Sequence, residues 1–236
     1  MIAPLVAALA PWQTWAPATC LPDDCFCEAI RDGLVRQPAN TWSSFAFLLA
    51  AVWVAGRPAH PRSSASKTLP RTEHWLLVSS LMLVGLGSAF YHASLTFIGQ
   101  VFDVSGMYLV ATFILLHRLG PTWKLPPVGS VLVFVGVNAG LMMAQVTTPS
   151  LRRLAFGILL VGALAVEWRS ARRGRRWLAI GASLMAVAFV IWILDRWRLV
   201  CATDSLVQGH AAWHLLGALA AVCLYRSYES EPSLSP

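Results

Sequence analysis

Seven long apolar segments constrain the fold of this chain more than any other feature of its sequence. They cover residues 41–57, 74–92, 100–118, 127–145, 150–167, 177–194 and 208–226. Each reaches the length of ~17 to 25 residues that a helix needs to cross a bilayer core of about 30 Å. Because backbone polar groups in lipid must be bonded within the segment, such segments form helices. The sequence therefore predicts an all-α membrane protein, built as a bundle of seven transmembrane helices.

The composition agrees with lipid as the solvent. Charged residues make up 12% of the chain and hydrophobic residues 57%, whereas soluble domains carry about 25% charged residues. The connectors are polar, with a Pro- and Ser-rich stretch at residues 57–73 and a basic run at residues 169–176. We divide the chain into an extracytoplasmic N-terminal arm at residues 1–40, a transmembrane domain at residues 41–226 and a cytoplasmic tail at residues 227–236.

The distribution of lysine and arginine predicts the orientation. Six of these residues fall on the side that holds the N-terminus: Arg31, Arg36, Arg152, Arg153, Arg196 and Arg198. The other twelve fall on the opposite side, which the positive-inside rule makes cytoplasmic. We therefore expect the N-terminus outside and the C-terminus in the cytoplasm. The net charge of +7 then reflects topology and anionic headgroups, and it gives no reason to expect a nucleic-acid partner.

Four of the five cysteines fall on the outer side. They are Cys20, Cys25 and Cys27 of the arm and Cys201 before the last apolar segment. Disulfides persist in oxidising compartments, so the predicted orientation permits them. The spacing of Cys25 and Cys27 is shorter than the two to four residues usual between zinc ligands. Disulfides are therefore favoured over a metal site for these cysteines.

Several ionisable side chains lie inside the apolar segments. His92 ends the second segment, Asp103 opens the third, and His210 and His214 open the seventh. The predicted topology puts all of them near the outer leaflet. His210 and His214, four residues apart, project from one helical face, and Ser88 shares a face with His92 in the same way. Ionisable groups in a membrane cost several kcal/mol and usually mark a functional site.

Each of these residues has a simpler role when considered alone. A single intramembrane histidine often bonds to a neighbouring helix, and Ser88 could serve close helix packing. Three imidazoles and a carboxylate at one depth favour a shared site. A catalytic zinc ion takes three protein ligands and keeps one position open, so we expect zinc at His92, His210 and His214.

Other polar residues are given no part in this site. His60, His74 and His117 lie at the predicted cytoplasmic ends or in connectors, where we expect them to be solvated. Ser43 opens the first helix, where capping is the default role. Asp195 is placed in a loop and needs no site to explain it.

The chain resembles the alkaline ceramidases, which share a superfamily with the adiponectin/progestin receptor-like proteins. The resemblance is carried by residues 27–47, by GLGSAFYHASL, by the Asp of GQVFD and by GHAAWH. The family pattern is a Ser four residues before a His, an Asp eleven residues after that His, and a final H-x-x-x-H. Ser88, His92, Asp103, His210 and His214 match it.

The resemblance implies an intramembrane zinc-dependent amidohydrolase that cleaves a linear amide bond in a ceramide-like or other N-acyl lipid. The three histidines would hold Zn²⁺, Asp103 would accept a proton from the attacking water, and Ser88 would support the metal or the developing oxyanion. A membrane lipid is then the expected partner, and the oligomeric state stays open. The family arrangement also implies a disulfide between Cys27 and Cys201, which leaves Cys20 and Cys25 to pair locally.

The arm departs from the family pattern. Eukaryotic members bind calcium there, but Gln37 stands where an acidic ligand is expected and Ile30 where an amide is expected. Of the clear ligands only Glu28 remains, and calcium needs 6–8 oxygen ligands, so we do not carry the calcium site over. Val104 also replaces the acidic residue that usually follows the family Asp. These differences leave the lipid substrate open. Short loops and composition suggest a bacterial member in the inner (plasma) membrane.

Two other functions compete with hydrolysis. A seven-helix receptor or lipid-binding protein could keep the metal as a structural element, but its site would be closed, and only three clear ligands are visible here. A transporter should show broken helices or repeats, and the sequence shows neither.

Overall fold

The computed structural model describes residues 11–21, 25–59 and 69–231. Within these residues the protein is helical and no strand is present; an isolated bridge joins Pro17 to Thr96. The elements are η1 (Pro11–Thr14), α2 (Pro38–Ser43), α3 (Phe45–Ala55), α4 (Arg71–Ser94), α5 (Phe97–Thr122), α6 (Pro127–Thr147), η2 (Pro149–Leu151), α7 (Arg152–Ser170), α8 (Arg175–Arg196) and α9 (Gly209–Ser230). The prediction of an all-helical protein is confirmed for this part of the chain.

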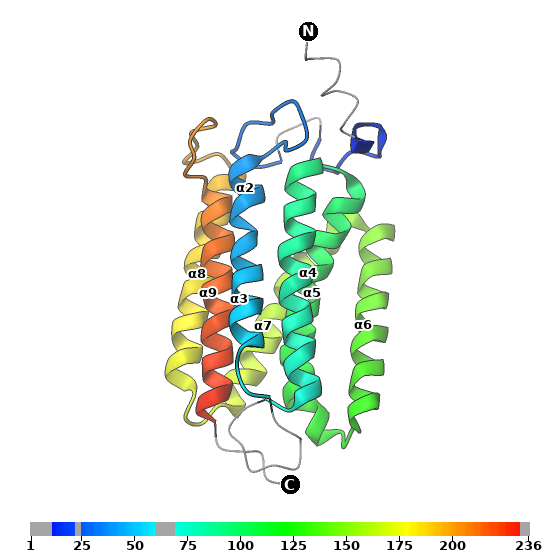
Figure 1. The fold of residues 1–236 in the computed structure, drawn as a ribbon, viewed down its shortest axis with the longest axis vertical. Coiled ribbons are helices and arrows are strands. Elements are labelled where there is room, and N and C mark those ends of the chain that lie inside the picture. The colour runs from blue at the N-terminus through cyan, green and yellow to red at the C-terminus, as the bar shows by residue number, and fades with distance from the viewer. Residues whose placement is uncertain (1–10, 22–24, 60–68, 232–236) are drawn as a thin grey trace.

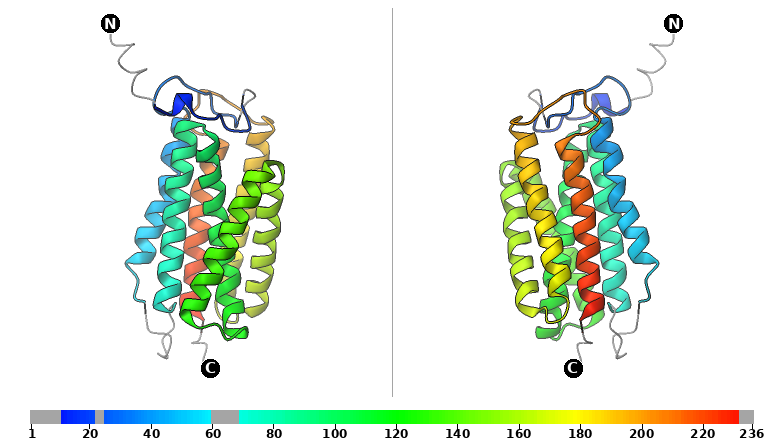
Figure 2. Two further views of the ribbon diagram at one scale, coloured as in Figure 1. Left: turned by 90° about the vertical axis from the view of Figure 1, so that its right-hand side faces the viewer. Right: turned by 90° about the vertical axis from the view of Figure 1, so that its left-hand side faces the viewer.

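The helices run up and down in one bundle, as Figures 1 and 2 show. Helices α2 and α3 follow one another in a single column and pack with α4 and α9. Helix α4 lies along α5, α8 lies along α9, and α7 packs on α5. Helix α6 stands at the edge of the bundle, where it packs on α5.

Within the described residues, five helical segments are long and apolar enough to cross a membrane: Arg71–Ser94, Phe97–Thr122, Pro127–Thr147, Pro149–Ser170 and Arg175–Arg196. The bundle also presents large apolar side chains outward; Leu49 is 72% exposed and Val161 is 69% exposed. Such a surface suits lipid rather than water, as expected of an integral membrane protein. Helices α3 and α9 occupy the other two predicted segments, and α9 continues to Ser230, beyond the predicted end at residue 226.

Glycines bring α4 and α5 into close contact. A Cβ atom at Gly87 would lie 2.8 Å from the backbone oxygen of Phe102, and one at Gly106 would lie 2.7 Å from Cα of Val84. Small residues at helix interfaces let two backbones approach in this way. Ser88 follows Gly87 and Asp103 follows Phe102, so the close approach places these two side chains next to each other.

The arm (described residues 11–21 and 25–37) folds across one end of the bundle, which we call the arm end. Its backbone bonds to the α4–α5 connection, with Ala18 N 2.9 Å from Leu95 O. It also bonds to the α8–α9 loop, with Ala29 N 3.0 Å from Thr203 O. In Figure 2 the arm and that loop lie across the same end. Two disulfides reinforce this layer; they are Cys20–Cys25 within the arm and Cys27–Cys201 to the loop.

The opposite end is held by a buried polar network. Arg118 of α5 pairs with Glu167 of α7, whose two carboxylate oxygens lie 3.0 and 2.9 Å from Nε of the guanidinium. His117 Nδ1 lies 2.6 Å from Glu73 Oε2 of α4. The expectation of solvated histidines is therefore wrong for His74 and His117, which are 1% and 8% exposed, because neighbouring helices cover them. His60 lies outside the described residues.

Candidate metal centre

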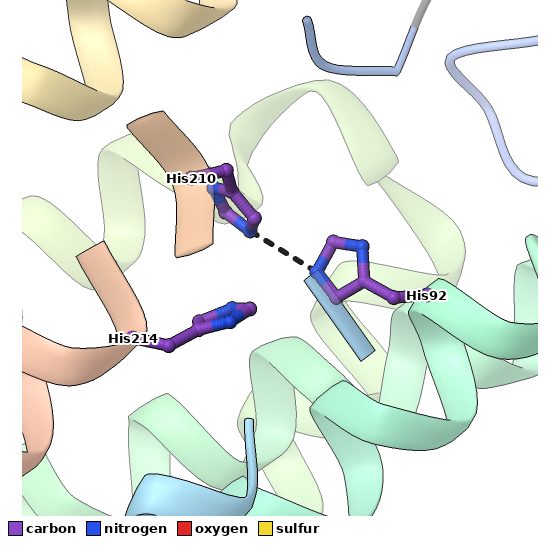
Figure 3. Close-up of side chains that lie close together, drawn as sticks. All are labelled: His92, His210 and His214. Carbon is purple, nitrogen blue, oxygen red and sulfur yellow. Dashed lines mark hydrogen bonds between the residues drawn. The ribbon is translucent and has the colours of Figure 1, made fainter. Parts of the chain in front are cut away.

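Three histidines from two helices converge at the arm end. His92 lies in the last turn of α4, and His210 and His214 lie in the first turns of α9. Their candidate ligand atoms all lie within 4.8 Å of one another, and all three side chains are buried. Figure 3 shows the rings facing a common point, with Nε2 of His92 3.1 Å from Nε2 of His210.

This nitrogen spacing fits a metal ion. Tetrahedral zinc with bonds of 2.0–2.1 Å holds neighbouring nitrogens about 3.3 Å apart. Two neutral imidazoles can place nitrogens this close if one carries the proton or if a cation lies between them. Three buried imidazoles form a zinc donor set, and the residues present therefore fit this ion.

The outward-facing nitrogens select the ligand atoms. His92 Nδ1 lies 2.9 Å from Oε1 of Gln37, to which it can donate its proton. His214 Nδ1 lies 2.8 Å from Oγ of Ser43, whose own hydroxyl donates to the Asn40 carbonyl at 3.0 Å. Partners of this kind keep the proton on Nδ1 and leave Nε2 free for the metal. The expected capping role of Ser43 is wrong, since neither α2 nor α3 has a side-chain cap.

Gln37 is itself held firmly by the arm. It is fully buried, its Nε2 donates to the Glu28 carbonyl at 3.2 Å, and its backbone N donates to His92 O at 3.1 Å. The Glu28 carboxylate accepts from the backbone N–H groups of Ala39 at 2.7 Å and Asn40 at 2.9 Å. Burial raises the pKa of the Glu28 carboxyl, against the opposing effect of these two hydrogen bonds. Glu28 thus serves the first turn of α2 instead of facing the histidines.

Phe26 covers the third histidine. Its ring stacks on His210 with centroids 3.7 Å apart and an interplanar angle of 21°. Nδ1 of His210 has no hydrogen-bond partner within the described chain. Phe26 stands between Cys25 and Cys27, so both disulfides hold the residue that closes the centre toward the arm.

Ser88 and Asp103 lie beside the histidines. Ser88 Oγ is 3.2 Å from Nε2 of His214, and Asp103 lines the same cavity as Ser88. The structure thus brings together, from α4, α5 and α9, all five residues that the sequence pattern singled out. The Ser88 hydroxyl and the Asp103 carboxylate therefore lie beside the candidate metal centre.

Asp195 is a residue whose importance sequence reasoning missed. It lies in the last turn of α8 and is 1% exposed, so its placement in a loop is wrong. Its Oδ1 accepts from the backbone N of His210 and its Oδ2 from the backbone N of Cys27, each at 3.1 Å. One carboxylate thereby positions the arm and the start of α9 together. The available sequence signal for a buried role was a single acidic residue directly after a strongly apolar segment.

An apolar cavity opens beside the histidines. Ser88, Asp103, His210 and His214 line its polar end. The rest runs between α4, α5, α7, α8 and α9, past residues such as Phe156, Leu178, Met185 and Leu224. Its shape and lining suit a hydrocarbon chain whose polar end reaches the candidate metal centre.

The fold and the site together define a helical integral membrane protein with a buried three-histidine centre at the head of an apolar cavity. The sequence model of the ceramidase family matches residues 26–230, and the chain belongs to that family. A putative alkaline ceramidase of Dictyostelium discoideum is 27% identical over 169 residues, which cover 60% of this chain and 58% of that protein. The resemblance to alkaline ceramidases is thereby confirmed.

Proposed function

We propose that this protein is an intramembrane zinc-dependent hydrolase that cleaves the amide bond of a ceramide-like or other N-acyl lipid. One observation carries the proposal. The His92, His210 and His214 nitrogens lie within 4.8 Å of one another, and Ser88 and Asp103 line an apolar cavity together with His210 and His214. Membership of the ceramidase family supports a lipid amide as the substrate.

The proposed chemistry follows from the positions of these side chains. Zinc at this position would polarise the amide carbonyl and make water a stronger acid. Asp103 accepts the proton of the attacking water and later returns it to the leaving amine. Ser88, which lines the cavity beside Asp103, orients that carboxylate and can donate to the developing oxyanion. The products are a fatty acid and a free amine.

The location of the cavity supports catalysis over a purely structural metal. His210 and His214 line the cavity, whereas Gln37, Ser43 and Phe26 cover the sides of the histidines that face the protein. The cavity therefore gives a lipid substrate an apolar route to the centre. A structural zinc site would be closed by a fourth protein ligand.

We propose that all seven helical columns span the membrane, with the arm end outside the cytoplasm and the C-terminus inside. The uneven distribution of lysine and arginine supports this orientation, and so do the two disulfides of the arm end, which require an oxidising compartment. The centre would then lie near the outer leaflet of a plasma membrane, at the depth of lipid amide groups. Residues 1–40 would form the extracytoplasmic arm, and the tail would follow the last helix.

Metal analysis and lipid turnover test the proposal together. Purified protein should contain about one zinc per chain and release fatty acid from a panel of N-acyl lipids. His214→Ala should lose most of the metal and the turnover. His117→Gln, a histidine variant at the opposite end, should keep both. Full metal retention in the triple variant of His92, His210 and His214 would end the proposal. Bound metal without turnover of any lipid would favour a receptor or lipid-binding protein.

A further inference from the structure

Two arginines line the same cavity as the candidate metal centre. Arg152 and Arg153 begin α7 at the arm end, and both contribute to the cavity wall together with Asp103. Arg152 is 7% exposed, whereas Arg153 is exposed. The positive charge of Arg153 acts on both His210 and Asp103. The cavity therefore carries cationic groups close to its polar end.

Neither guanidinium has an ion-pair partner within the described chain. Arg152 Nη2 donates to the neutral hydroxyl of Thr19 at 2.6 Å. The Arg153 guanidinium lies 5.8 Å from the ring centroid of Trp192. Nearby, Nε of Arg196 is buried without a hydrogen-bond partner. Among the described residues that line the cavity, two arginines face a single carboxylate, Asp103, so positive charge is in excess there.

The opposite end of the bundle shows what a purely structural arginine receives in this fold. Arg118 is buried against Glu167, whose two carboxylate oxygens share its single Nε–H and one of which also accepts from Nη2. A buried cation without an ion-pair partner is costly in a membrane, and Arg152 is such a cation within the described chain. A further cation at the histidines would add to the positive charge facing Arg152 and Arg153. An anion bound in the cavity would offset this charge, and a neutral headgroup would not.

We propose that Arg152 and Arg153 bind anionic oxygens of the substrate headgroup, a phosphate or a carboxylate, while the acyl chain fills the apolar cavity. The proposal rests on the proposed function, because it places the substrate amide at the histidines. Guanidinium groups present paired N–H donors that match phosphate and carboxylate oxygens. The preferred lipid is therefore an N-acyl lipid with an acidic headgroup, in contrast to ceramide, whose headgroup is neutral.

Matched lipids test the headgroup preference. Ceramide and ceramide 1-phosphate with the same acyl chain are compared in purified full-length protein, with an N-acyl amino acid as a carboxylate probe. Hydrogen bonds to charged groups contribute ~1.5–3 kcal/mol, so kcat/KM should be about 10- to 100-fold higher for the anionic lipids. Arg153→Gln should bring the ratio of kcat/KM for anionic over neutral lipid close to one, and this ratio is compared within each variant because Arg153 lines the cavity beside Asp103. Arg153 is the better position because its side chain makes no hydrogen bond in the described structure.

Two controls sharpen the result. Arg36→Gln removes an arginine from the same end that does not line the cavity, and it should leave the preference intact. Inorganic phosphate added to ceramide turnover separates the two sources of anionic oxygens. Inhibition that Arg153→Gln abolishes would show that free phosphate also occupies the site. An anionic-lipid preference without such inhibition would assign the site to lipid headgroups alone.

Failure of this proposal can be distinguished from failure of the proposed function. Equal turnover of neutral and anionic lipids, unaffected by Arg153→Gln, would overturn the headgroup assignment and leave the amidase intact. Absence of turnover for every lipid would count against the amidase. In that case native mass spectrometry still measures binding of ceramide 1-phosphate to wild type and to Arg153→Gln. Equal binding by wild type and Arg153→Gln would overturn the assignment there too.

Discussion

Side chains outside the histidine cluster determine which nitrogen two of the three histidines, His92 and His214, present to the centre. Gln37 accepts from Nδ1 of His92, and Ser43 lies against Nδ1 of His214. Both come from the segment around α2, just before the first long helix. Such partners fix ring orientation and raise the basicity of the ligand nitrogen. The arm and α2 therefore tune a centre whose proposed ligands lie on α4 and α9.

Replacing Gln37 should weaken metal binding without unfolding the bundle. Gln37→Leu removes the acceptor for His92 Nδ1, and loss of such a partner typically costs 10- to 100-fold in metal affinity. Competition with a chromophoric zinc chelator measures this change. Gln37→Glu keeps an acceptor and should retain much of the affinity. Gln145→Leu removes another buried glutamine, on α6, and should leave the zinc affinity unchanged. Wild-type zinc affinity in Gln37→Leu would contradict the role of Gln37 in supporting His92 as a ligand.

Asp103→Asn should abolish amide hydrolysis and leave zinc bound. Asparagine keeps the size of the side chain but cannot accept a proton near neutral pH, and loss of a general base typically costs a factor of ~10²–10⁴ in rate. Ser88→Ala should cost less, because its hydroxyl only supports the carboxylate or the oxyanion. Fatty-acid release from any active substrate, measured beside zinc content, checks both variants. Undiminished turnover in Asp103→Asn would remove Asp103 from the mechanism.

Among the helices, the close contact between α4 and α5 depends on a glycine, whose lack of a side chain lets the two backbones approach. Gly87 leaves room for the backbone of Phe102, and this approach sets the separation of Ser88 and Asp103. A difference of one methyl group at this interface would move two helices. The geometry of the proposed site is therefore a property of the interface as much as of its polar residues.

Gly87→Ala should lower stability and activity together. Its Cβ would lie 2.8 Å from Phe102 O, an atom of the backbone that cannot turn away, and overpacking of this kind typically costs 1–3 kcal/mol. Gly136→Ala on α6 is the matched control, since nothing lies within 4 Å of its Cβ. Thermal unfolding in detergent and lipid turnover check both variants. A Gly87→Ala protein as stable and active as Gly136→Ala would show that the close approach is dispensable.

Substitutions in the Arg118–Glu167 pair at the opposite end should lower stability without affecting the metal content. Glu167→Gln leaves the Arg118 guanidinium buried without a countercharge, and breaking a buried pair typically costs 3–5 kcal/mol. Denaturant unfolding measures the loss, and zinc content should stay near one per chain. Replacing both partners, as Arg118→Met with Glu167→Leu, should recover part of the stability because no isolated charge remains. A neutral effect of Glu167→Gln would contradict the structural role of the pair.

At the scale of the whole molecule, the helices were predictable because their signal is local. A long run with few charges is recognisable without knowledge of its neighbours, and the structure has a helix in each predicted segment. The convergence of the five pattern residues was predictable for a related reason. Once the chain was assumed to cross the membrane repeatedly, His92, Asp103, His210 and His214 all fell at one end.

The supporting residues were not predictable, because their roles arise from contacts between distant segments. Gln37 is 55 positions from His92 in the chain, and Asp195 is 168 positions from Cys27. From sequence alone, a polar residue near the end of a segment is expected to cap a helix or lie in a loop. Its actual contacts become visible only when the helices are assembled. His117 shows the same effect, since its burial depends on Glu73 of another helix.

Breaking the disulfide between the arm and the α8–α9 loop should loosen the cover of the centre. Removal of a native disulfide typically costs 2–5 kcal/mol, and Cys27→Ser should also speed zinc loss to a chelator, because Phe26 would be free to leave His210. Cys223→Ser, which removes the free buried cysteine of α9, is the control. Unfolding temperature and the rate of zinc release measure the two effects. Zinc release as slow as in wild type would show that the disulfide does not hold the cover.

The position of Phe26 between two disulfide-bonded cysteines has a consequence for biogenesis. A newly inserted chain with reduced cysteines already contains the histidines, but the ring above His210 is not yet held in place. In the orientation that we propose, its fixation is an oxidation event that follows delivery of the arm to an oxidising compartment. Maturation would thus be timed by export, and a chain retained in a reducing environment, or inserted in the wrong orientation, would remain an unfinished precursor.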